Sequence, residues 1–146
     1  MNDRNLVDEW LEIANDDLDA AQYLFERPHR KQLEIICYHC QQSVEKSLKA
    51  YLCANNIEVP KTHELELLCH RCNELNPAFS DFYDACETLE IYATQTRYPN
   101  RIDVDEQNTK YALEQASVIY NFVSEQIQEL FCSEDEEETQ GIKFEL

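Results

Sequence analysis

The sequence predicts an all-α protein that forms a single domain. Its 146 residues include one glycine and four prolines, which leaves little of the turn chemistry that a multi-stranded protein needs. Leucine, glutamate, alanine and glutamine, which are good helix formers, are abundant instead. Apolar residues recur three and four positions apart through most of the chain, as they do in amphipathic helices. A chain of this length can bury a substantial core.

The first two predicted helices follow directly from this spacing. The first runs from about Asp3 to Phe25, and a break at residues 27–29 ends it. The second ends near Asn55 and Asn56 and carries an apolar residue at every fourth position. This stripe comprises Ile36, Cys40, Val44, Leu48 and Leu52. Because the stripe is long and continuous, we expect the second helix to lie at the centre of the domain.

Capping signals place the remaining helices. Thr62 is a plausible N-cap for a third helix, which Pro77 stops. Asn76 followed by Pro77 also predicts the start of a fourth helix, over residues 77–95. Asp103 with Glu106 three residues later predicts a capping box that opens a long last helix.

The last predicted helix ends near Phe131, and an acidic segment follows. Five consecutive acids at residues 134–138 repel one another, so residues 132–146 are expected to be a disordered tail. The apolar residues at its end could alternatively form a docking peptide. The predicted organisation is a helical domain over residues 1–131 with an acidic tail over 132–146.

The charge pattern excludes some classes of partner. The formal net charge is −18, and residues 102–146 alone carry 12 acidic and 2 basic groups. A large basic surface for duplex DNA is therefore not expected. Residues 29–101 carry 10 acidic and 8 basic groups, so a small anion site is possible there. Neither a membrane-spanning apolar run nor a signal peptide is found, which predicts a cytoplasmic protein with reduced cysteines.

Two stretches carry residues from which a binding site could be built. Residues 41–50 place Gln42, Lys46 and Lys49 on neighbouring strips of the second predicted helix. Residues 96–99 place Arg97 at a predicted helix break, where a turn can expose it. Lysine as a point charge and arginine as a planar fork both suit a phosphate, which predicts an anion-binding or partner-binding groove. The alternative is a solvated helix face with an ion pair between Glu45 and Lys49.

His63 and Lys61 lie close to the start of the third predicted helix. The backbone N–H groups and the dipole at a helix start favour anions, so His63 could contact a ligand there. The alternative is a ring that hydrogen-bonds to the end of the bundle. Lys61 beside it favours a binding site.

Two C-x-x-C pairs, residues 37–40 and 69–72, raise the question of a zinc site. The gap between the pairs is longer than in zinc ribbons. Each pair also lies within a predicted apolar-periodic helix rather than in a glycine-containing knuckle. Core cysteines are therefore favoured, and no metal or cofactor is predicted.

The chain resembles the HEPN domain family from about Leu6 to Leu130. The resemblance depends on three segments in the family's order and spacing: residues 41–50, the stretch Lys61 to Leu65, and the Arg97-Tyr98-Pro99 turn. It implies an up-and-down helical bundle of four to five helices, commonly a homodimer, that often works beside a small nucleotidyltransferase. Nucleotide binding is among the roles that the resemblance implies.

Many HEPN proteins are metal-independent ribonucleases, with a histidine four to six residues after an arginine. Here the residues after Arg97 contain no histidine in that window. Cleavage of RNA through its own 2′-hydroxyl needs a group that exchanges a proton near neutral pH, which histidine can do and arginine cannot. No catalytic residue is therefore predicted, unless Arg97 and His63 act in a ribonuclease with a degenerate motif.

These observations predict a non-catalytic, dimeric module that binds a nucleotide, a nucleotidyltransferase partner or both, in a toxin–antitoxin type of system. The predicted site comprises Gln42, Lys46, Lys49, Lys61, His63 and Arg97. The alternative is a ribonuclease toxin, for which RNA is the substrate. In the last predicted helix, Leu113 and Tyr120 lie beside the main apolar stripe, and this second face is the predicted dimer surface.

Overall fold

The computed structural model describes residues 3–28, 32–96, 99 and 102–145, with the backbone alone for residues 140–145. This part of the chain is helical and contains no strand. The elements are α1 (Arg4–Phe25), α2 (Leu33–Ala54), α3 (Leu65–Leu75), the 3₁₀ helix η1 (Pro77–Phe82), α4 (Tyr83–Thr94) and α5 (Glu106–Glu145). The predicted all-α helical bundle is confirmed. No described helix has the length and apolar character needed to cross a membrane.

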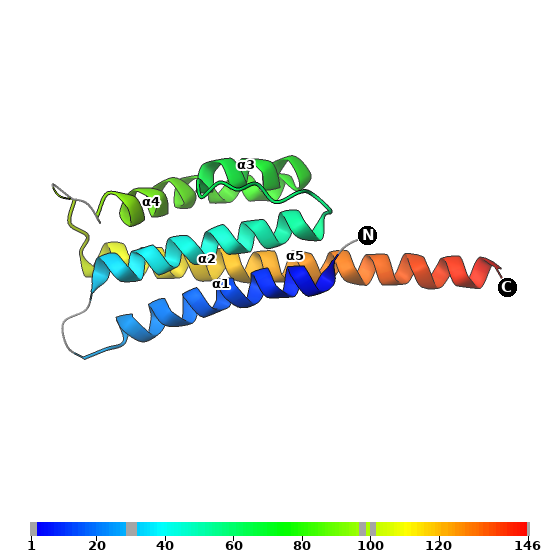
Figure 1. Ribbon diagram of the computed structural model, residues 1–146, viewed down its shortest axis with the longest axis horizontal. Coiled ribbons are helices and arrows are strands. Elements are labelled where there is room, and N and C mark those ends of the chain that lie inside the picture. Colours follow the sequence, from blue (N-terminus) through cyan, green and yellow to red (C-terminus); the bar gives the residue numbers. More distant parts are fainter. Residues whose placement is uncertain (1–2, 29–31, 97–98, 100–101, 146) are drawn as a thin grey trace.

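Helix α2 lies at the centre of the bundle, as the sequence predicts. Helices α1 and α5 run along one side of it, and the shorter α3 and α4 lie on the other side (Figure 1). Fifteen of its 22 residues are buried. All five residues of the predicted stripe are at most 1% exposed: Ile36, Cys40, Val44, Leu48 and Leu52. Every side chain that points outward from α2 therefore lies beside a neighbouring helix.

Small residues let α1 approach α2 closely. Ala14 and Ala21 of α1 are fully buried, and Ser43 of α2 donates a hydrogen bond of 2.8 Å to the carbonyl oxygen of Ala14. Nδ1 of His39 on α2 lies 2.9 Å from Oδ1 of Asp17 on α1, so a polar contact joins the same two helices. These contacts fix α1 along the side of α2 that carries the candidate site.

The ends of α1 and α2 agree with the sequence. Asp3 caps α1 by accepting a hydrogen bond of 3.0 Å from the N–H of Leu6. After α2, Asn56 adopts a left-handed conformation with φ of 62°, and the N–H of Ile57 bonds back to the carbonyl of Leu52. This pattern is a Schellman-type end, in which asparagine tolerates positive φ.

The starts of α3 and α5 differ from the predicted ones. Thr62 accepts a hydrogen bond from the N–H of Glu64, but α3 begins only at Leu65. The capping box of α5 is formed by Asp105 and Asn108, which bond to each other's backbone N–H groups, and not by Asp103 and Glu106. Each difference is a shift of two residues, since a neighbouring side chain of similar chemistry makes the bond.

Two further boundaries differ from expectation. The single helix predicted over residues 77–95 is divided into η1 and α4. Helix α5 continues to Glu145, past its expected end near Phe131. Arg4 of α1 supports this continuation: its guanidinium lies 4.4 Å from the Phe131 ring centroid and 2.8 Å from Oδ1 of Asp135. The prediction considered repulsion among the acids but not a cation from α1.

Candidate functional site

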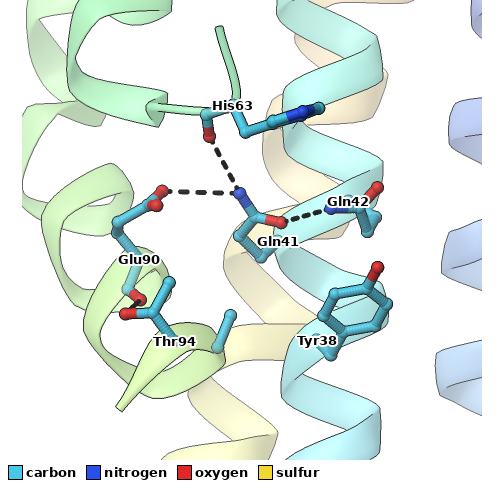
Figure 2. A pocket seen from close by; sticks show the side chains of 7 residues that line it. Tyr38, Gln41, Gln42, His63, Glu90 and Thr94 are labelled. Atoms are coloured by element: carbon cyan, nitrogen blue, oxygen red, sulfur yellow. Dashed lines mark hydrogen bonds between the residues drawn. The ribbon is translucent and has the colours of Figure 1, made fainter. Parts of the chain in front are cut away.

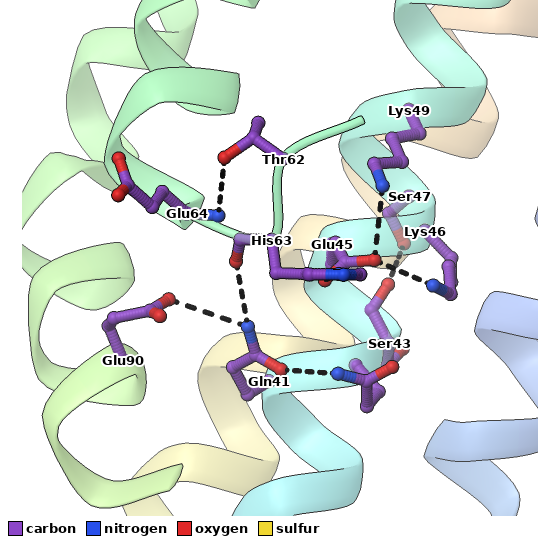
Figure 3. Close-up of polar contacts among 11 residues, drawn as sticks. Gln41, Ser43, Glu45, Lys46, Ser47, Lys49, Thr62, His63, Glu64 and Glu90 are labelled. Carbon is purple, nitrogen blue, oxygen red and sulfur yellow. Dashed lines mark hydrogen bonds and ion pairs between the residues drawn. The ribbon is translucent and has the colours of Figure 1, made fainter. Parts of the chain in front are cut away.

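The candidate site is organised around Glu45, a carboxylate on α2 that is fully buried. Its Oε2 accepts hydrogen bonds from the ammonium groups of Lys46, at 2.6 Å, and Lys49, at 3.3 Å. Its Oε1 lies 2.9 Å from Nδ1 of His63 (Figure 3). Because an ionised carboxylate only accepts hydrogen bonds, Nδ1 of His63 is the donor. We call these four residues the Glu45 cluster.

The Glu45 cluster carries more positive than negative charge. Two lysines share one carboxylate, which leaves one positive charge in excess even when His63 is neutral. The side chains of Lys46 and Lys49 are 18% and 6% exposed, whereas that of His63 is 77% exposed. The positive charge is therefore held close to the protein surface rather than on a freely moving side chain.

Trp10 of α1 covers the two lysines. Its ring centroid lies 5.9 Å from Nζ of Lys46 and 5.7 Å from Nζ of Lys49. An aromatic face attracts a cation at this distance, and the attraction is stronger where water is excluded. Trp10 therefore helps to hold both ammonium groups beside Glu45.

The pKa of Glu45 reflects a competition between burial and positive neighbours. Burial favours the neutral acid and by itself would raise the pKa. Hydrogen bonds from Lys46 and His63, with the charges of Lys46 and Lys49, outweigh burial and hold the pKa below its ordinary value. Glu45 is therefore ionised at neutral pH, and the cluster keeps the charges described above.

A pocket of about 410 Å³ lies next to this cluster, between α2 and α4 (Figure 2). Gln41 crosses its inner wall: its Nε2 donates to the carbonyl oxygen of His63, at 3.1 Å, and to Oε2 of Glu90, at 3.4 Å. Gln42 in turn donates to Oε1 of Gln41 at 2.8 Å. The pocket is lined by Tyr38, Gln41, Gln42, His63, Glu90, Ala93 and Thr94.

The pocket and the cluster are joined along one face of α2. Tyr38, Gln42 and Lys46 follow one another at four-residue intervals, so they lie on the same strip of the helix. At the helical rise, the strip from Tyr38 to Lys46 is about 12 Å long. It combines an aromatic ring, an amide and a cation in that order, which suits a ligand with a flat ring at one end and an anion at the other.

The structure places the sequence-predicted site residues differently from one another. Gln42 and His63 line the pocket, and Lys46 lies beside it in the Glu45 cluster. Lys49 is in the same cluster but almost fully buried. Lys61 is exposed and forms no hydrogen bond or ion pair within the described part of the chain. Arg97 lies outside the described residues.

Sequence reasoning missed three residues of the site. Glu45 was considered only as an ion-pair partner of Lys49, although it directly follows Val44 of the apolar stripe, a position that predicts burial. Gln41 and Glu90 were not singled out because they come from different helices. Only the fold brings them within hydrogen-bonding distance.

The cysteines of both C-x-x-C pairs are buried within helices. Cys37 and Cys40 lie in α2, and Cys69 and Cys72 lie in α3, all fully buried. Burial raises the pKa of Cys40 and Cys72 well above the ordinary thiol value, because a thiolate is poorly solvated there. Within the described residues, no group of three or more histidine, cysteine or acidic side chains is arranged to hold a metal ion.

Replacement of Glu45 tests the energetic role of the cluster. Glu45→Gln keeps the size of the side chain but leaves two ammonium groups without their counter-charge. We expect the free energy of unfolding, measured by urea denaturation at pH 7, to fall by about 3 kcal/mol. Adding Lys49→Met should recover part of this loss, because it removes the more buried of the two cations. Glu114→Gln on the exposed face of α5 is the matched control, and a loss equal to that of Glu45→Gln would contradict this role.

The same variant predicts a pH dependence. Because the pKa of Glu45 in the folded protein lies below its unfolded value of 4.5, its ionised form stabilises the fold. This contribution is fully present above that value and is lost as the pH falls through the folded pKa. The difference in stability between the wild type and Glu45→Gln should therefore shrink as the pH falls from about 5 towards about 3. A difference that stays constant over this range would show that the charge of Glu45 does not carry the effect.

Comparisons with known proteins agree with the bundle described above. The sequence model of the HEPN domain matches residues 7–127. The crystal structure of TT1696 from Thermus thermophilus is 26% identical, with a TM-score of 0.70 over 82% of this chain and 96% of that chain. ST0689, an archaeal HEPN homologue, is 26% identical, with a TM-score of 0.65 over 83% and 97%. No curated protein sequence matches. Because the family match spans most of the chain, this protein belongs to the HEPN domain family.

Proposed function

We propose that this HEPN domain is a non-catalytic module that binds a nucleotide in the pocket between α2 and α4. The observation that carries the proposal is the positive excess of the Glu45 cluster beside a pocket lined by Tyr38 and two glutamines. The chain as a whole is strongly acidic, so a net positive cluster is an exception that suits an anionic group. An aromatic ring and amides suit a nucleobase and a sugar.

The strip on α2 gives this ligand an orientation. The base would lie against Tyr38, the sugar near Gln42, and the phosphate near Lys46 and His63. Lys46 uses one of its three N–H groups on Glu45, so donors remain for a phosphate oxygen. Lys49 would act through its charge, because its side chain is only 6% exposed. Lys61 and Arg97 stay candidates for phosphate contact from the sequence alone.

Titration with nucleosides and their 5′-monophosphates tests this arrangement. The wild type should bind the monophosphates more tightly than the nucleosides. Lys46→Met keeps the aliphatic stem of the side chain and should weaken monophosphate binding about tenfold while leaving nucleoside binding nearly unchanged. Calorimetry at low ionic strength measures both.

Lys110→Met is the matched control, because Lys110 is an exposed lysine on α5 far from the pocket in sequence and lies beside α1. It changes the net charge by the same amount as Lys46→Met and should leave both affinities unchanged. Equal losses in the two variants would assign the effect to overall charge. No detectable binding of any nucleotide to the wild type would overturn the proposed function.

We also propose that the module is a homodimer that uses the surface formed by α1 and α5. Val118 of α5 is 50% exposed and lies at the edge of a hollow between these helices, and Tyr23 of α1 is 72% exposed. Leu113, expected at a dimer surface, is buried within the protomer, and Tyr120 is half-buried. The proposed surface therefore centres on Val118, and a two-fold axis would pair it with its copy.

Sedimentation velocity at micromolar concentration tests the dimer. The wild type should sediment as a dimer and Val118→Asp as a monomer, because the new charge would have no partner at the interface. Leu67→Asp, on an exposed apolar position of α3, is the control and should stay dimeric. A monomeric wild type would contradict the proposal, and dissociation caused only by Leu67→Asp would move the interface to α3.

A small nucleotidyltransferase is the protein partner that we propose, in a toxin–antitoxin type of pair, on the basis of the family resemblance. The exposed nucleotide pocket supports this choice, because an enzyme that transfers nucleotides could share the bound ligand. Co-purification of the two proteins, compared between the wild type and Lys46→Met, measures whether the pocket takes part.

One observation favours the alternative of a metal-independent ribonuclease. Glu45 orients His63 through Nδ1, while the largely exposed ring leaves Nε2 within reach of a substrate. Such a carboxylate–histidine pair can transfer protons. Cleavage of RNA without divalent metal that is lost in His63→Ala, but kept in His70→Ala, would favour this alternative. No cleavage by the wild type would favour the binding module.

A further inference from the structure

We propose that the pocket selects guanine over adenine, and that Glu90 and Thr94 on α4 read the base. This inference rests on the proposed nucleotide site and adds its specificity. It depends on which hydrogen-bonding groups face the pocket from α4, opposite the Tyr38–Gln42–Lys46 strip of α2 (Figure 2).

Glu90 is held in place by two donors on a single oxygen. The backbone N–H of Leu65, at the start of α3, lies 3.3 Å from Oε2 of Glu90, and Nε2 of Gln41 lies 3.4 Å from the same atom. Oε1 forms no hydrogen bond within the described part of the chain. The carboxylate therefore has a fixed position and one oxygen available to a ligand, and that oxygen can only accept.

Thr94 offers a second acceptor one turn further along α4. Its hydroxyl donates its proton to the carbonyl oxygen of Glu90 at 2.7 Å. With the proton committed to the backbone, the lone pairs of Oγ1 are the groups left for a ligand. Glu90 and Thr94 both line the pocket and lie on the same face of α4. The α4 wall therefore presents two acceptors side by side.

Two adjacent acceptors match guanine and oppose adenine. The Watson–Crick edge of guanine carries two neighbouring donors, the N1–H and the N2 amino group. Oε1 of Glu90 would accept the first and Oγ1 of Thr94 the second. Adenine carries an unprotonated N1 at the corresponding place, so its lone pair would face the carboxylate. A site built to accept a hydrogen bond strongly rejects an analogue that lacks the donor, because the buried acceptor is then unpaired.

Gln42 completes the match from the other side of the pocket. One N–H of its amide is used on Gln41, and the second has no partner within the described part of the chain. That N–H could donate to the O6 of guanine or to a sugar oxygen. Adenine has an amino group where guanine has O6, so a donor there discriminates in the same direction.

Calorimetric titration of the full chain with GMP, IMP and AMP tests the selection. IMP keeps the N1–H of GMP but lacks the 2-amino group. The expected order of affinity is GMP, then IMP, then AMP, with GMP at least about tenfold tighter than AMP. Thr94→Val should bring the affinities of GMP and IMP together. Glu90→Gln, which can turn a donor towards the pocket, should bring the ratio of GMP to AMP close to one.

The ratio of affinities within one protein is the readout, because a variant that is merely less stable loses affinity for GMP and AMP alike. Glu87→Gln, an exposed acid one turn earlier on α4 that does not line the pocket, should keep the wild-type ratio. Lys46→Met should weaken GMP and AMP equally.

Two results distinguish the two proposals. Equal binding of GMP and AMP to the wild type, or tighter binding of AMP, would overturn guanine selection and leave nucleotide binding standing. Binding of none of the three would overturn both. A wild-type preference for GMP that survives in Glu90→Gln would overturn the assignment of Glu90.

Discussion

The balance of charges at Glu45 is the constraint on which this structure depends. A carboxylate without exposure to water on the central helix is costly unless its lone pairs are occupied. Here two lysines and a histidine occupy them. Since Lys46 and Lys49 lie on α2 and His63 lies on the segment before α3, this balance holds that segment against α2. The same interaction that makes the fold tolerable also places His63 at the mouth of the pocket.

This arrangement explains why core and site occupy one helix. Helix α2 packs against helices on two sides, so any polar group on it is either enclosed or at the edge of a groove. Gln41 is nearly buried and spends its N–H groups on α4 and on the carbonyl of His63. The wall of the pocket is consequently built from satisfied hydrogen bonds and resists rearrangement, which is the preorganisation that a ligand site benefits from.

The sequence predicted the fold well because helices carry local signals. The apolar stripe of α2 and the Asp3 cap depend on residues three or four apart, and both were found where expected. The ends that differ are those where a non-local or competing contact decides. Arg4 supports the extension of α5 from another helix, and Asp105 takes the capping role expected of Asp103. Such contacts have no signature in a short window of sequence.

The site was predictable to a smaller extent for the same reason. Gln42 and Lys46 could be assigned to one helical strip by their spacing alone. That Glu90 approaches Gln41 is a property of the packing of α4 on α2, across 49 positions of sequence. The net charge of a segment also gave no sign that a carboxylate within it would be buried with two lysines.

The acidity of the chain decides what size of anion the Glu45 cluster can serve. The excess of positive charge is about one unit and is confined to the cluster, while residues 102–146 alone carry 12 acids. At physiological ionic strength, charges act over a Debye length of about 8 Å. A single phosphate held at the cluster lies within that distance of Lys46 and His63. A long polyanion would instead continue past the cluster onto an acidic surface and meet repulsion that increases with its length. The electrostatics therefore favour a mononucleotide over an extended RNA, and a small ligand is the one that a pocket of about 410 Å³ can enclose.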